Sequence, residues 1–260
     1  MIVQERADGS VILINQTDHA KISGLFAAHW GNSQFARPKP YESTVRAAMF
    51  HDVGWYKYET GPRLNTNMKP MAFMHVPLDE HTLANFQWAT DWMNEIDPYA
   101  GALMRKHRNG LWLGRYNAIS YPVAFNNRNM NPLLQAFVDR NEAARKSEES
   151  KVDAAEFAIN YQLLQVWDLM SLYFCTQVPK DDYIEPVPRG YKGEGSVRMD
   201  LKPLGSNKVA ISPYPFDTKT LPVAIVHRHL PKVTFADEAE FRRTYYEAPL
   251  QSLQFEFVPG

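Results

Sequence analysis

Apolar residues recur at helical spacing through the first two thirds of the chain. They fall at positions i, i+3, i+4 and i+7, which is the pattern of amphipathic helices. Asp97-Pro98 pairs a capping side chain with a first-turn proline, as is typical of a helix start. The most apolar stretch covers about residues 152–176. The pattern predicts six helices, over about residues 17–30, 41–52, 79–96, 97–108, 133–147 and 152–176.

Alternating apolar residues, the period of strands, occupy the two ends of the chain. Residues 1–15 contain two short runs of this kind around Asp8-Gly9, a hairpin turn signal. Because an isolated hairpin is only marginally stable, we expect it to pair with C-terminal strands in one small sheet. The expected C-terminal elements are strands over residues 197–203, 208–214, 221–229 and 251–258 and a short helix over residues 237–247.

These elements predict a mainly α fold, a helical bundle with a small β-sheet or α+β appendage. The length of 260 residues fits one large domain with such an addition. The helical, metal-binding domain would cover residues 16–178. The appendage would combine residues 1–15 with residues 196–260, and the Pro- and Gly-rich residues 179–195 would link the two parts.

A ligand-capable pair, His51-Asp52, ends the apolar helical stretch that begins at Ala47 and stops before Gly54. A buried imidazole or carboxylate without a partner costs roughly 2 kcal/mol or more, so both side chains require partners. A metal ion would satisfy both at once. This interpretation requires further ligands from the rest of the chain.

Further His and Asp residues fall on inward faces of the other predicted helices. His19 lies on the buried face of the first helix, and Asp168 continues the apolar stripe of the last one. His107 lies on the inward side of the fourth helix, and His81 in the first turn of the third, with His75 as its alternative. Imidazole and carboxylate ligands suit Fe, Mn, Zn or Ni better than Ca. We predict a site for one or two divalent transition-metal ions with the ligands His19, His51, Asp52, Asp168, His107 and His81.

This order of ligands resembles a known superfamily. His19, then the pair His51-Asp52 with Gly54 two residues later, then Asp168 is similar to the HD-domain pattern. The resemblance implies an all-helical domain that binds metal through these four side chains. Most members of that superfamily are phosphohydrolases or phosphodiesterases, and a smaller branch consists of di-iron oxygenases.

Two further features refine the resemblance. Members with two metals add histidines between the HD pair and the last Asp, where His81 (or His75) and His107 stand in this chain. The segment 16–19 together with the β-rich tail also resembles a bacterial family of unknown function within the same group. Trp55 occupies a position where the cyclic-dinucleotide branch often has lysine, which argues against that activity.

The resemblance implies a metal-dependent phosphohydrolase acting on a small phosphorylated metabolite or nucleotide. A first ion would activate water, and a second would be bridged by Asp52 and held by His81 and His107. With a single ion, His81 and His107 become the candidate catalytic residues, as a general acid or as phosphate contacts. The alternatives are an HD-type di-iron oxygenase and a non-catalytic binding module. Positive charge for a phosphate is available at Lys57, Arg63, Lys69, Lys106 and Arg108.

Composition narrows the expected partners and compartment. A net charge of -1 gives no electrostatic reason to bind nucleic acid or an anionic membrane, which leaves a small-molecule substrate. No apolar run approaches the roughly 20 residues that span a bilayer. The N-terminal residues lack a signal-peptide pattern and Cys175 is the only cysteine, so we expect a cytoplasmic protein. An exposed face formed by Trp88 and Trp92 would indicate a homodimer, whereas a buried one would be core.

Overall fold

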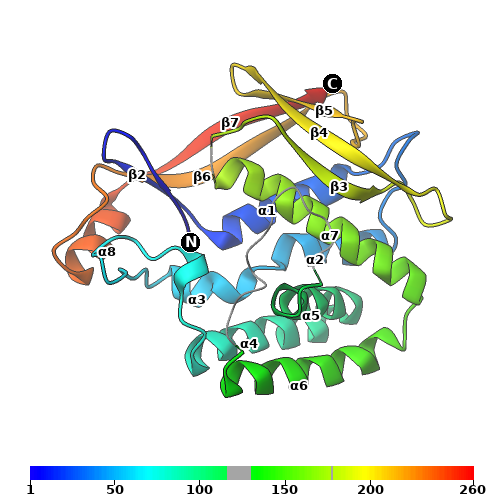
Figure 1. The fold of residues 1–260 in the computed structure, drawn as a ribbon, viewed down its shortest axis with the longest axis horizontal. Coiled ribbons are helices and arrows are strands. Elements are labelled where there is room, and N and C mark those ends of the chain that lie inside the picture. Colours follow the sequence, from blue (N-terminus) through cyan, green and yellow to red (C-terminus); the bar gives the residue numbers. More distant parts are fainter. Residues whose placement is uncertain (116–129, 177) are drawn as a thin grey trace.

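The protein combines a curved sheet with layers of helices (Figure 1). The computed structural model describes residues 1–115, 130–176 and 178–260. Helices account for 47% of the described residues and strands for 22%, and seven of the strands they contain form one mixed sheet, so the fold is α+β. The expected mainly α HD-type bundle with a small β appendage is therefore wrong.

The six predicted helices are present close to the predicted positions, and capping side chains mark the starts of the last four of them. The Asp97 carboxylate accepts hydrogen bonds from the backbone N–H groups of Tyr99 and Ala100, both at 3.1 Å. Of the loop predicted over residues 109–130, residues 116–129 lie outside the described part of the chain. The helices are α1 Gln16–His29, α2 Tyr41–Phe50, α3 Tyr56–Glu59, α4 Glu80–Ile96, α5 Pro98–Trp112, α6 Pro132–Glu149, α7 Ala154–Cys175 and α8 Glu238–Glu247, with 3-10 turns η1 Val53–Trp55 and η2 Phe73–His75.

The sheet joins the two ends of the chain. Its strands are β1 Ile2–Glu5, β2 Val11–Ile14, β3 Asp182–Pro188, β4 Ser196–Gly205, β5 Lys208–Ser212, β6 Leu221–Leu230 and β7 Leu250–Pro259. They lie in the order β1-β2-β6-β7-β5-β4-β3, and all neighbours are antiparallel except β5 and β7. The expected pairing of the N-terminal hairpin with C-terminal strands is confirmed, since β2 pairs with β6.

Strand β3 falls within residues 179–195, which were expected to be a linker. This strand contains Pro186 and Pro188. Because proline cannot donate a hydrogen bond within a sheet, the two residues argued against a strand in the sequence. The structure accommodates them by placing β3 at the sheet edge, with an irregular register between Ile184 and Val187. Proline is tolerated at such positions.

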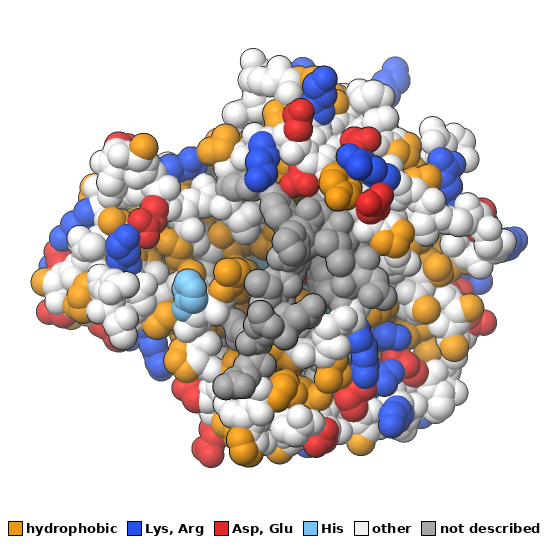
Figure 2. Space-filling model, in the orientation of Figure 1, with side chains coloured by type: hydrophobic (Ala, Val, Ile, Leu, Met, Phe, Trp, Pro, Cys, Tyr) orange, Lys and Arg blue, Asp and Glu red, His pale blue; other side chains and the backbone are white. Residues whose placement is uncertain are grey.

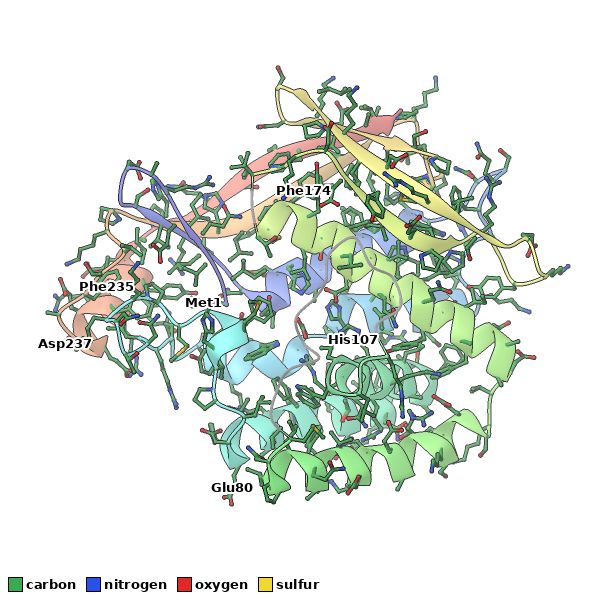
Figure 3. The ribbon with its side chains drawn as sticks, in the orientation of Figure 1. Met1, Glu80, His107, Phe174, Phe235 and Asp237 are labelled. Carbon is green, nitrogen blue, oxygen red and sulfur yellow. The ribbon has the colours of Figure 1, made fainter. Side chains whose placement is uncertain are left out.

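Helices α1 and α7 pack directly against one face of the sheet (Figures 1 and 3). The Phe174 ring on α7 lies 4.7 Å from the Phe255 ring and 4.8 Å from the Phe257 ring, both on β7. Phe26 on α1 lies 5.4 Å from Phe257. The sheet therefore shares the main core with the helices. This contact explains why α7 is apolar on nearly all sides, since it is covered by both layers.

Helices α1 and α2 approach closely where α1 has a glycine. A Cβ atom added at Gly24 would lie 2.7 Å from the Met49 Cβ atom and 2.9 Å from its Cα atom. Because Gly24 has no side chain, the last turn of α2 can pack directly against α1. The residues that follow this turn are His51 and Asp52.

We predict that Gly24→Ala destabilises the protein by about 1–3 kcal/mol, because overpacking at the α1–α2 contact outweighs the higher helix propensity of alanine. The measurement is the free energy of unfolding from urea titration. Gly61→Ala is the matched control, since a Cβ atom there meets nothing within 4 Å and Gly61 has no positive φ. If Gly24→Ala were as stable as the parent protein, the contact would not be a tight one.

Candidate metal centre

Four helical segments bring five ligand-capable side chains together in the interior. His19 lies on α1, His51 and Asp52 directly follow α2, His107 lies on α5, and Asp168 lies on α7. All five side chains are buried. Figure 3 shows His107 near the middle of the helical layers. Two sets of three have donor atoms within 4.8 Å of one another, namely His19, His51 and Asp168, and His51, Asp52 and His107.

The donor atoms are spaced as the ligands of one ion would be. His19 Nε2 lies 3.1 Å from Asp52 Oδ2 and 3.7 Å from Asp168 Oδ1. His51 Nε2 lies 3.5 Å from Asp168 Oδ1 and 3.8 Å from Asp52 Oδ2. Ligand bonds of about 2.1 Å place neighbouring donors about 3.0–3.4 Å apart, so only small adjustments separate this arrangement from a coordinated one.

The His51 ring directs one nitrogen at the two carboxylates. Its Nδ1 lies 2.8 Å from the Ala48 carbonyl oxygen, which can only accept a hydrogen bond, so Nδ1 carries a proton. Its Nε2 is buried and has no hydrogen-bond partner among the described residues, although the Asp52 and Asp168 carboxylates face it. In the neutral ring Nε2 holds a lone pair that can bind a cation. Burial alone would lower the pKa of His51, but Asp52 and Asp168 raise it, so a proton takes this place when no cation is bound.

Two buried serines orient the His19 ring. The Ser171 Oγ lies 2.6 Å from His19 Nδ1 and donates to the Asp168 carbonyl oxygen at 2.8 Å. It therefore accepts from His19 Nδ1 and leaves the lone pair of Nε2 towards the carboxylates. The Ser23 hydroxyl lies 3.1 Å from the Ser171 Oγ. Neither serine was predicted, although each stands three or four residues from a predicted ligand on a buried helical stripe.

The charges within the cluster shift its pKa values strongly. Burial alone would raise the pKa of Asp52, but Arg108 and the neighbouring histidines hold it well below its usual range. Burial would likewise raise the pKa of Asp168, but His51 and His19 lower it to about 2. Burial and the charge of His51 lower the pKa of His107 to about 3. Both carboxylates are thus ionised and His107 is neutral at pH 7, the state in which these groups coordinate metal, whereas His51 must lose the proton that its raised pKa favours.

The cluster opens into a cavity of about 50 Å³. Buried Arg108 reaches it from α5 and donates from Nη2 to Asp52 Oδ1. Its guanidinium carbon lies 4.3 Å from the centre of the Phe86 ring and 5.9 Å from that of Trp55. Besides these charged groups, the walls are largely apolar, formed by Trp55, Phe73, Leu78, Phe86, Leu111, Trp112, Leu169 and Leu172.

The structure does not bring every predicted site residue to the cluster. His81, in the first turn of α4, and His75, in η2, are both exposed to solvent. Among the cations proposed for phosphate, Arg108 alone lines the cavity within the described residues. The others have contacts elsewhere, Lys57 with Trp88, Arg63 with Tyr58, Lys69 with Glu5 and Lys106 with Glu149.

Comparison with known proteins identifies one family. The model of DUF3891, described as a protein of unknown function, matches residues 1–232, and the chain belongs to this family. No curated protein and no solved structure matches the chain. The expected membership of the HD-domain superfamily is wrong, because the matching family is DUF3891 and the curled seven-stranded sheet differs from an HD helical bundle.

We predict that adding Mn²⁺, Fe²⁺ or Zn²⁺ raises the melting temperature and that a chelator reverses the rise. Binding to the folded state alone stabilises it by about 2.7 kcal/mol when the metal is at 100 times its Kd. His51→Ala should abolish the response in a thermal-shift assay. His29→Ala is the control, because His29 lies on α1 but pairs with Asp217, away from the cluster. A metal response retained in His51→Ala would exclude this centre.

We also predict that Ser171→Ala weakens metal binding by about 10–100-fold, the usual effect of losing a group that orients a ligand. Ser23→Ala should have a smaller effect, since it leaves the bond between Ser171 and His19 in place. Competition with a chelating dye measures both Kd values. Equal Kd values for Ser171→Ala and the parent protein would show that His19 needs no such orientation.

Proposed function

We propose that this member of the DUF3891 family is a metal-dependent phosphohydrolase that acts on a small phosphorylated molecule. The observation that carries the proposal is the position of Arg108, whose guanidinium lies in the same buried cavity as the His and Asp cluster. A fixed guanidinium beside a metal-binding cluster is suited to recognise an anion.

The charge of the cavity supports a phosphate ligand. The carboxylates of Asp52 and Asp168 carry two negative charges, and Arg108 offsets one of them. A divalent ion would leave the centre with a single excess positive charge, which a phosphoryl group can neutralise. Such an ion supplies Lewis-acid polarisation of a phosphoryl oxygen and lowers the pKa of a water molecule to about 7.

The side chains around the cluster are suited to bind phosphate, to limit the access of water and to coordinate metal. Arg108 has five N–H donors, of which one binds Asp52, so it can hold phosphate oxygens while Asp52 fixes its orientation. The aromatic wall residues Trp55 and Phe86 pack against the guanidinium and limit the access of bulk water. His107 is neutral at pH 7, which suits a ligand better than the general acid predicted from the sequence.

The exterior also favours a small substrate over a large polyanion. Acidic and basic side chains are interspersed over the face seen in Figure 2, and the chain as a whole carries a net charge of -1. In the described part of the chain, no helix has the length and apolar character needed to cross a membrane.

We predict that Arg108→Ala lowers kcat/KM for p-nitrophenyl phosphate by about 10²–10³-fold in the metal-loaded protein, the usual loss when one electrostatic contact to the reacting group is removed. Arg108→Lys should recover part of the activity, because a point charge replaces a planar, multiply bonding group. Lys106→Ala is the control on the same helix, since Lys106 pairs with Glu149 outside the cavity.

The companion measurement is oxygen uptake by the iron-loaded protein, which tests the oxygenase alternative. Phosphate release with no oxygen uptake is the expected result. Oxygen consumption without hydrolysis of any phosphomonoester would contradict the proposal, as would equal activities of Arg108→Ala and Lys106→Ala.

A further inference from the structure

We propose that the centre takes a single divalent ion, and that the guanidinium of Arg108 stands where a two-metal centre would hold its second ion. The inference deepens the proposed function and rests on it. It replaces the open choice between one and two ions with a defined stoichiometry, and it gives Arg108 a structural reason to lie beside the ligands.

The two ligand-capable sets share His51 and, through it, one donor atom. Both the set with His19 and the set with His107 include His51. The Nδ1 of His51 is committed to the Ala48 carbonyl oxygen, so only Nε2 can coordinate. One imidazole nitrogen has one lone pair and binds one ion. The two sets are therefore alternative descriptions of one site and cannot both be filled.

A two-metal centre would use the Asp52 carboxylate as the bridge between its ions. Two-metal sites hold their ions about 3.5–4 Å apart, a distance that a bridging carboxylate commonly spans with one oxygen on each ion. In Asp52, Oδ2 faces His19 at 3.1 Å, whereas Oδ1 accepts from Arg108 Nη2. While that bond is in place, Asp52 lacks the second free oxygen that such a bridge uses.

With Asp52 engaged, few donors remain for a second ion. Asp168 Oδ2 and His107 Nε2, 3.8 Å apart, are the two that the cluster of described residues can still offer. Catalytic zinc sites use three protein ligands, so this pair falls short of one. His81 was expected to complete such a site, but its side chain is exposed on α4.

The net charge of the cluster also favours a single divalent ion. Arg108 cannot lose its proton, and it is held between Asp52 and the Phe86 ring. Beside Arg108 and two carboxylates, one divalent ion leaves one excess positive charge, whereas two would leave three. Excess charge among apolar walls is strongly unfavourable. The guanidinium of Arg108 thus provides the positive charge that a second metal ion would otherwise offer to a bound phosphoryl group.

The test is the number of ions bound per chain. Full-length protein is loaded with Mn²⁺ or Zn²⁺, passed through a desalting column and analysed by inductively coupled plasma mass spectrometry, and the Mn²⁺ form is examined by electron paramagnetic resonance. We expect one ion per chain and no exchange-coupled manganese signal. Two ions per chain in the parent protein would overturn the inference.

Arg108→Gln provides the second arm, because it removes the charge and frees Asp52 Oδ1. We expect its stoichiometry to rise towards two, with the second ion bound more weakly, while the control Lys106→Gln stays at one. One ion in a folded Arg108→Gln protein would contradict the role given to Arg108. The proposed function fails separately, since it is excluded by a parent protein that binds no metal, and it survives a parent protein that binds two ions and still hydrolyses phosphomonoesters.

Discussion

The structure depends on two ionised carboxylates buried at the meeting point of four helical segments. Asp52 and Asp168 both face the Nε2 atoms of His19 and His51, so two negative charges lie together among buried imidazole rings. Such a group is stable in an apolar interior only if cations neutralise it. Arg108 supplies one positive charge, and the spacing of the remaining donors matches a metal ion.

The rest of the fold holds these groups in register. The sheet packs against α7 through Phe174, and α7 carries Asp168 and Ser171 towards α1. The close approach at Gly24 brings the end of α2, with its His and Asp pair, to the same point. Because the ligands come from four separate elements, binding an ion would also tie these elements together.

Part of this arrangement could be predicted from the sequence. Apolar stripes identify the inward face of a helix, so the burial of His19, His107 and Asp168 followed from their positions. The same stripes do not tell whether a buried face meets a helix or a sheet, and the packing of α7 on the sheet was missed for that reason. Periodicity also could not rank five candidate cations, and only the contacts single out Arg108.

The order of the His and Asp residues was a poor guide to the fold. The order of His and Asp residues indicated which side chains gather inside, but it did not determine the topology around them, and the inferred superfamily was wrong. His81 illustrates the same limit, since its place in the chain suited a second metal whereas its place in the first turn of α4 exposes it to solvent.

The most direct test of the central claim is anomalous X-ray diffraction from crystals of the metal-loaded protein, collected at the absorption edge of the metal. The account predicts one anomalous peak per chain, about 2.1 Å from the Nε2 atoms of His19 and His51 and within ligand distance of the Asp168 carboxylate. A cluster without any peak, or a metal bound elsewhere with His51 still facing the two carboxylates, would contradict it.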